Sequence, residues 1–299
     1  MIATERSAAT SSVKPDSLRQ VCLLELRNLL HTQTGWIKVH AAEYLLWANE
    51  PASVREVYLE ELRRFENESP YRIGIWRVLA QAATDTAEKN KWIVRITTAF
   101  INPDGPDRVH AAESLAKLGV SPMSLDRKVT QEALVSPNGA LALYTLWGTT
   151  LSDDATSVTS KRSKFLEMAL NQHEDVAIRR LSAFILRRLG DLNVADWTKL
   201  ANATLIEPVS SGIRVNLLHA AIVTSPASEK QTIPYYQLRT ELLAVHSTSL
   251  TSDLLELIAA LSQKGESTDV VVLLPYLKHE NADVRAGAAY AVLKIIQRK

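Results

Sequence analysis

The sequence has few of the residues that break or cross-link a chain. It contains one cysteine, ten glycines and eleven prolines among 299 residues. The single cysteine, Cys22, excludes an internal disulfide and a zinc site built from cysteines, and it fits a reducing compartment. So few glycines and prolines predict short loops and a chain made mostly of regular elements. Disulfide-rich, collagen-like and largely disordered proteins are therefore excluded.

Long apolar runs and an excess of charge of one sign are also lacking. No stretch approaches about 18 consecutive apolar residues, so we predict no membrane-spanning helix. Residues 1–17 have no apolar segment typical of a signal peptide, and we expect a flexible polar arm there. The 34 basic and 33 acidic residues give a net charge of +1, which predicts no strong attraction to nucleic acid. We expect a soluble, cytoplasmic protein.

Residues 18–299 contain a repeated helical pattern. Val-His-Ala-Ala-Glu occurs at 39–43 and again at 109–113, and the related segment Val-Arg-Ala-Gly-Ala-Ala occupies 284–289. The equivalent first apolar positions are Val39, Ile73, Val109, Leu141, Val176, Val215, Leu254 and Val284. Their spacing of roughly 35 residues is typical of repeats that consist of two helices. We therefore predict a single all-α domain over residues 18–299.

Short motifs mark several expected helix boundaries. Ser69-Pro70 and Ser136-Pro137 are expected to begin helices, because serine is a good N-cap and proline is tolerated in the first turn. Leu118-Gly119 and Leu189-Gly190 are expected to end helices, because glycine readily adopts the left-handed conformation found there.

Two segments carry a resemblance to a known family. Val-His-Ala-Ala-Glu-Ser-Leu-Ala-Lys-Leu-Gly at 109–119 and Asp-Val-Arg-Ala-Gly-Ala-Ala-Tyr-Ala at 283–291 resemble the second helix of HEAT repeats. The resemblance implies an armadillo-like helical fold, a right-handed α–α superhelix (solenoid) of about eight HEAT-like helix pairs. Its second helices would line the concave face. HEAT repeats occur in scaffolds, transport factors, lyases and a few enzymes, so the resemblance does not define a function.

One side of the predicted second helices is polar. Positions one, four and eight residues after each first apolar residue lie on the same side, because successive residues are turned by about 100°. We call these side chains the polar stripe and expect them to face the concave groove. The candidate binding residues of the polar stripe are His40, Glu43, Trp47, Arg77, Gln81, His110, Glu113, Lys117, Arg180, Asn216 and His219.

Two interpretations of the polar stripe stay open. In the first, Glu43, Arg77 and Glu113 form an alternating ladder of ion pairs that fixes the register of neighbouring units. In the second, the stripe is a recognition surface, where Arg77 supplies a forked donor and Trp47 a flat stacking surface. The stripe is richest in polar residues over the first three units, so we expect a site in the N-terminal half.

Our functional hypothesis is a non-enzymatic scaffold that binds a protein or peptide partner in its concave groove. The alternative is an enzyme or small-molecule binder in the same groove, which would require a closed pocket and a strongly shifted pKa of a Glu or His. A third and weaker alternative is a nucleic-acid backbone binder that uses a basic cluster. That cluster consists of Arg179, Arg180, Arg187 and Arg188.

No motif predicts catalysis, a cofactor or a metal site. The pairs His40–Glu43 and His110–Glu113 are spaced for one helical face, but each offers only two ligands, too few for a closed zinc site. The sequence lacks a Gly-x-Ser-x-Gly motif and a phosphate-binding glycine loop. We expect Cys22 to be a core residue. Nothing in the sequence predicts an oligomeric state.

Overall fold

The computed structural model of the protein describes residues 15–51, 53–245 and 250–298. These residues form sixteen α-helices and no β-strand, which confirms the all-α class. Residues 1–14 of the predicted polar arm lie outside the described residues. Pro15 already begins α1, so the helical domain starts before residue 18. Within the described ranges, no helix is long and apolar enough to cross a membrane.

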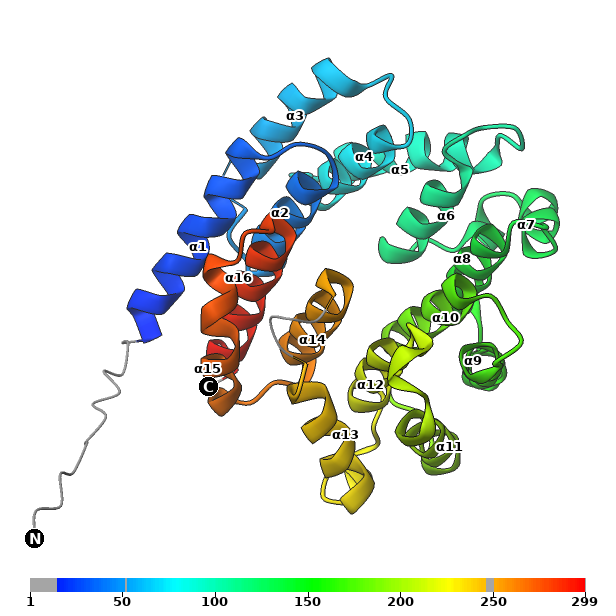
Figure 1. Ribbon diagram of the computed structural model, residues 1–299. Helices are drawn as coiled ribbons and strands as arrows, with labels where there is room; N and C mark the ends of the chain where they lie inside the picture. The colour runs from blue at the N-terminus through cyan, green and yellow to red at the C-terminus, as the bar shows by residue number, and fades with distance from the viewer. Residues whose placement is uncertain (1–14, 52, 246–249, 299) are drawn as a thin grey trace, which may run out of the picture.

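The even-numbered helices form an inner wall that the odd-numbered helices cover (Figure 1). The inner helices are α2 (Gly35–Trp47), α4 (Tyr71–Gln81), α6 (Arg108–Lys117), α8 (Gly139–Thr149), α10 (Val176–Arg188), α12 (Arg214–Val223), α14 (Thr251–Lys264) and α16 (Ala282–Ile296). The outer helices are α1 (Pro15–Thr32), α3 (Val54–Phe65), α5 (Thr86–Ile101), α7 (Arg127–Leu134), α9 (Ala155–Leu170), α11 (Val194–Ile206), α13 (Ile233–Leu243) and α15 (Val270–Leu273).

The inner helices contact one another in chain order, and the last one returns to the first (Figure 1). Helix α16 packs on α14, and it also packs on both α1 and α2. The described chain therefore closes into a ring, which the sequence pattern did not predict. Each predicted first apolar position lies in an inner helix. The pairing of helices is less regular near the C-terminus, where α13 packs on α11 and α12.

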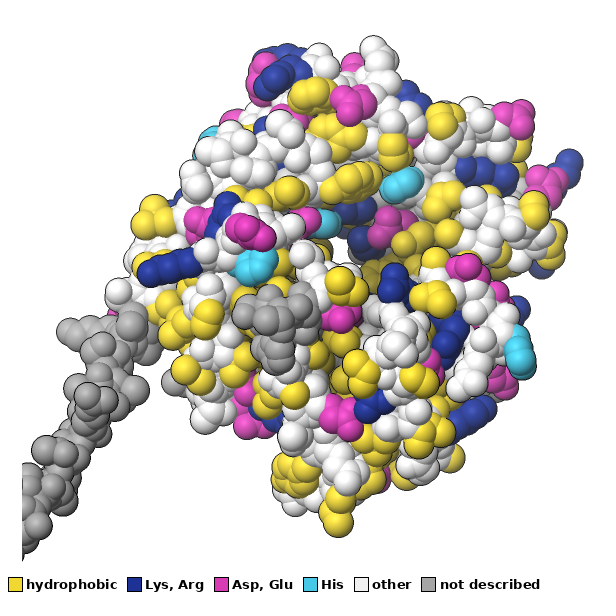
Figure 2. All heavy atoms as spheres, in the orientation of Figure 1, with side chains coloured by type: hydrophobic (Ala, Val, Ile, Leu, Met, Phe, Trp, Pro, Cys, Tyr) yellow, Lys and Arg dark blue, Asp and Glu magenta, His cyan; other side chains and the backbone are white. Residues whose placement is uncertain are grey.

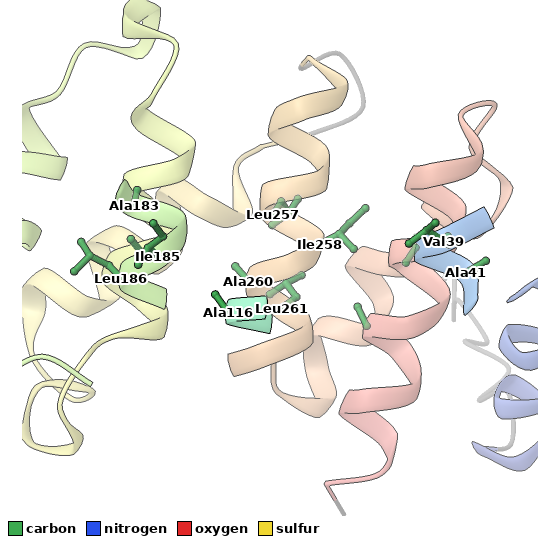
Figure 3. Packing of buried hydrophobic residues seen from close by; sticks show 14 of the residues in the cluster. Val39, Ala41, Ala116, Ala183, Ile185, Leu186, Leu257, Ile258, Ala260 and Leu261 are labelled. Atoms are coloured by element: carbon green, nitrogen blue, oxygen red, sulfur yellow. The ribbon is translucent and has the colours of Figure 1, made fainter. Parts of the chain in front are cut away.

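Small residues allow the inner helices to approach closely. Ala41 in α2 and Ala288 in α16 are fully buried. At Gly287 in α16, an added Cβ would lie 3.1 Å from the Cγ2 atom of Ile258 in α14. Figure 3 shows Ile258 pointing from α14 toward α16. This contact explains why small residues occupy 286–289, since a larger side chain would push the two helices apart.

Helix boundaries follow local capping chemistry. Helices α4 and α8 begin close to Ser69-Pro70 and Ser136-Pro137, but neither serine caps the helix that follows. Asn138 caps α8, because its side-chain oxygen accepts a hydrogen bond from the backbone N–H of the third helical residue. The predicted helix ends are confirmed: Gly119 and Gly190 follow α6 and α10 with φ angles of 75° and 85°.

Candidate functional site

The candidate binding residues all lie on inner helices, but they occupy three different environments. Three of them are buried between helices: Glu43, Arg77 and His219. Four line a hollow at the centre of the ring: Glu113, Lys117, Arg180 and Asn216. The remaining four contact side chains of neighbouring helices: His40, Trp47, Gln81 and His110. The polar stripe is therefore partly structural and partly accessible.

Arg77 and Glu43 form a buried ion pair between α4 and α2. Arg77 Nε donates to Glu43 Oε1 at 2.7 Å and Arg77 Nη2 donates to Oε2 at 3.2 Å. A third donor, Arg77 Nη1, reaches the hydroxyl of Ser114 in α6 at 3.1 Å. Burial alone would raise the pKa of Glu43, but the charge of Arg77 outweighs it, with help from Lys117, and holds that pKa at about 2.

The expected exposure of Arg77 and Glu43 in a groove is wrong, because their side chains are 1 % and 2 % exposed. In α2 and α4 the fourth position of the stripe falls in the contact between neighbouring inner helices, whereas Glu113 and Arg180, at the same position in α6 and α10, line the hollow at the ring centre. The predicted ladder is present in its first step only. Arg77 bonds Ser114 instead of Glu113, and Glu113 pairs with Lys117 at 2.7 Å within its own helix.

Trp47 and Gln81 extend this polar contact toward the surface. The indole Nε1 of Trp47 donates to Gln81 Oε1 at 2.8 Å, and Gln81 Nε2 donates to Glu43 Oε1 at 2.8 Å. Trp47 stays 40 % exposed. Its ring meets the edges of Tyr44 and Tyr290, which stack on each other with centroids 4.6 Å apart. An accessible aromatic surface therefore lies beside the buried ion pair.

A hollow of about 450 Å³ lies at the centre of the ring, among α6, α8, α10, α12 and α14. Figure 2 looks onto this side of the molecule and shows an opening at the middle of the ring, with charged side chains around it. The hollow is lined by Glu113, Lys117, Tyr144, Arg180, Leu181, Phe184, Arg187, Asn216, Ser252 and Glu256. Charged, amide and aromatic groups thus face one space.

A second hollow, of about 540 Å³, adjoins the first. It lies among α2, α4, α5 and α6, and its lining includes Trp47, Gln81, Lys89 and Lys117. Lys117 is part of the lining of both hollows. The ammonium group of Lys117 also lies 5.8 Å from the ring centroid of Phe184, a favourable cation–π distance. The two hollows together give the inner wall of the ring an accessible polar and aromatic surface.

His219 belongs to a buried polar cluster beside the first hollow, and its expected exposure is wrong. Its Nδ1 lies 2.6 Å from Glu256 Oε2 and is also in contact with Arg187, while Nε2 lies 3.1 Å from the Gln263 amide. Burial lowers the pKa of His219 to about 4, and the charge of Arg187 adds to this effect. Burial alone would raise the pKa of Glu256, but the charge of Arg187 outweighs the effect of burial and holds the pKa of Glu256 at about 2.

The four arginines of the predicted basic cluster do not share one side. Arg179 is buried and donates to Glu207 at 3.0 Å, and Arg187 is buried against Glu256. Arg180 is exposed and donates to the backbone carbonyl of Gly212 at 2.8 Å. Only Arg180 and Arg188 are exposed, so the nucleic-acid alternative loses half of its proposed contacts.

Arg188 is the last residue of α10 and lies one helical turn after Phe184, which lines the first hollow. Its side chain is exposed, yet the surrounding protein removes enough water to lower its pKa. The carboxylate of Glu43 on α2 and the phenol of Tyr290 on α16 oppose this lowering of the pKa, whereas the neighbouring cation Arg187 adds to it. Among the described residues, none accepts a hydrogen bond from Arg188 or forms an ion pair with it.

Two histidines of the polar stripe lie outside both hollows. His40 Nδ1 contacts Asp283 Oδ1 at 2.9 Å, which joins α2 to α16 across the closure of the ring. Arg285 Nε donates to Glu25 Oε1 at 2.7 Å and joins α16 to α1. His110 stacks on Trp36 with centroids 5.4 Å apart. His40 and His110 therefore hold helices together. The His40 side chain is still 40 % exposed, and the role of both residues as ligand contacts stays a prediction.

Sequence reasoning missed several residues that line the first hollow. Glu256 lies two residues after Leu254, the first apolar position of its unit, so the repeat pattern assigns it to the apolar side of α14. Taking Leu255 instead would have put both Glu256 and Gln263 on the polar side. Tyr144 was missed because its position was assigned to the apolar face. An aromatic residue with a hydroxyl is compatible with either assignment.

No side-chain cluster suited to a metal ion was found in the described part of the chain, where no three His, Cys, Asp or Glu residues come together. No family model, curated protein or solved structure matches this chain. The resemblance to HEAT repeats consequently rests on the quoted segments alone.

Proposed function

We propose that this protein is a non-enzymatic scaffold that holds a protein or peptide segment at the centre of its helical ring. The observation that carries this proposal is the pair of hollows that share Lys117 in their lining. Each has a volume within the range of about 300–1,000 Å³ that is usual for ligand sites. Exposed and half-buried aromatic rings, such as Trp47 and Phe184, lie beside cations, a composition that is common at protein interfaces.

We also propose that the helix pairs form a right-handed superhelix of about eight HEAT-like units. The support is that the quoted segments at 109–119 and 283–291 fall in or directly around α6 and α16, where inner helices pack closely. A cytoplasmic location remains part of the proposal. The support is that Cys22 is the only cysteine of the sequence, which fits a reducing compartment.

The alternative of an enzyme receives less support from the same residues, although three pKa values are strongly shifted. Catalytic acids and bases work best when their pKa lies near the operating pH. The pKa values of Glu43 and Glu256 are about 2, and that of His219 is about 4. These carboxylates stay ionised and this imidazole stays neutral at pH 7. All three side chains are engaged by neighbouring groups, which favours a structural role.

The proposal is tested by filling the first hollow. Asn216 lines it, and the matched position Asn202 is exposed on the outer helix α11. We expect wild-type protein to capture a subset of sequences from an array of short synthetic peptides. Asn216→Trp should lose that binding, while Asn202→Trp should retain it. Fluorescence anisotropy with the captured peptides would then give the affinities. Equal binding by all three folded proteins, or no peptide binding at all, would overturn the proposal.

A further inference from the structure

The charged groups of the inner wall are nearly all neutralised within the protein. Glu43 pairs with Arg77, Glu113 pairs with Lys117, and Glu256 pairs with Arg187. Each of these carboxylates has its cation within hydrogen-bonding distance. A ligand that brought a positive charge would have to compete with an existing cation at every one of these sites. The inner wall therefore offers little to a basic ligand.

Two arginines on α10 have no carboxylate partner among the described residues: Arg180 donates to the backbone carbonyl of Gly212, whereas Arg188 has no acceptor at all. Its guanidinium carries five N–H donors, and none of them is used by the described residues. The carboxylate of Glu43 acts on the charge of Arg188, but Glu43 already accepts hydrogen bonds from Arg77 and Gln81. An exposed guanidinium that is surrounded by protein and partly desolvated binds an incoming anion more strongly than one in open water.

Neighbouring groups on the inner wall also favour a ligand rich in acceptors. Lys117 uses only one of its three donors on Glu113. Asn216 lines the first hollow, and the described residues give its side-chain amide no hydrogen bond. Arginine matches the planar carboxylate geometry with two parallel hydrogen bonds. A carboxylate is thus the group that these free donors suit best.

We propose that the polypeptide segment held at the ring centre is acidic, and that Arg188 binds a carboxylate of an Asp or Glu side chain of the partner. This inference rests on the proposed function and adds the chemical class of the partner. Tyr290 acts on the charge of Arg188, and Trp47 packs edge-on against Tyr290, so both rings would contact the apolar parts of the same segment. The partner is expected to bind less tightly as the salt concentration rises.

The test uses fluorescently labelled hexaglutamate, hexaglutamine and hexalysine, with affinities measured by anisotropy. Wild-type protein should bind hexaglutamate at least about tenfold more tightly than hexaglutamine. Arg188→Gln should remove most of that preference, and Arg188→Lys should retain part of it. Arg127→Gln is the matched control, because Arg127 is an exposed arginine on the outer helix α7. It should bind like wild type. Because Arg188 has no partner among the described residues, its variants should keep the wild-type melting temperature.

The outcomes separate this inference from the proposed function. Equal affinity of wild type for hexaglutamate and hexaglutamine, while Asn216→Trp still abolishes peptide binding, would overturn the acidic preference and leave the scaffold function standing. Equal losses in Arg188→Gln and Arg127→Gln would overturn the role of Arg188. Displacement of hexaglutamate by an equal concentration of inorganic phosphate would overturn the assignment to a polypeptide, because a free anion would then be the better ligand.

Discussion

The substitution Arg77→Ala gives the sharpest test of how the inner wall is held together. Arg77 is 1 % exposed and makes three hydrogen bonds, two to Glu43 and one to Ser114. Its removal leaves the Glu43 carboxylate buried, with Gln81 as its remaining donor. Breaking a buried ion pair from one side costs about 3–5 kcal/mol, because an uncompensated charge stays in the interior.

The depressed pKa of Glu43 gives a similar magnitude. A fall from 4.5 to about 2 corresponds to about 3 kcal/mol of stability at about 1.36 kcal/mol for each tenfold change in acidity. Because the folded-state pKa lies below the unfolded one, this stability is present above pH 4.5 and is lost as the pH falls toward 2. Arg77→Ala should therefore also weaken the dependence of stability on pH in that range.

The assay is urea unfolding followed by circular dichroism, with Arg55→Ala as the matched control. Arg55 forms a similar ion pair with Glu88 through two hydrogen bonds, with donor–acceptor distances of 2.8 and 3.0 Å. This pair lies on the outer surface of the protein. The loss of stability in Arg55→Ala should be far smaller, because water replaces the lost partner. Equal losses in the two variants would refute the reasoning that burial of the Arg77–Glu43 pair determines its contribution.

Two further predictions concern the buried histidine and the close approach of α14 and α16. The pKa of His219 falls from 6.5 to about 4 on folding, because the folded protein disfavours the charged imidazole. Its contribution to the free energy of unfolding is therefore complete above pH 6.5 and decreases as the pH falls, with a loss of about 2 kcal/mol by pH 4.5. Melting temperatures measured from pH 7 to pH 4.5 should therefore fall less in His219→Gln than in wild type, and parallel curves would contradict this. Gly287→Val should destabilise the protein by about 1–3 kcal/mol in urea unfolding, because an added Cβ would lie 3.1 Å from Ile258. Ala87→Val on the exposed surface of α5 is the control, and an equal effect there would rule out the crowding.

The sequence predicts the helices and much of the inner surface, because both follow from local periodicity. Glu113, Arg180, Lys117 and Asn216 line the hollow at the ring centre, as the polar stripe predicts. Glu113 and Arg180 lie four residues after the first apolar residue of their units, Lys117 lies eight residues after it, and Asn216 lies one residue after it. The same periodicity cannot distinguish an open face from a contact between neighbouring helices. Glu43 therefore appears in the stripe although Arg77 of the next inner helix covers it.

The repeat pattern does not predict ring closure, because closure depends on contacts between helices near the two ends of the chain. His40 and Asp283 are 243 residues apart in the sequence, and no repeat pattern pairs them. A periodic pattern records how each unit packs on the next one. The small twist between successive units decides whether the first and last units meet, and that twist comes from many side-chain volumes acting together.

Ring closure underlies both the site and the proposed function, and one distance measurement tests it directly. Nitroxide labels would be placed at Leu24→Cys in α1 and Glu280→Cys before α16, in a Cys22→Ser background. Both positions are exposed and lie near the Glu25–Arg285 contact. The axes of packed helices lie about 8–10 Å apart, so pulsed electron paramagnetic resonance should give one narrow distribution at short distance. A long or broad distribution would contradict a closed ring and, with it, the central site.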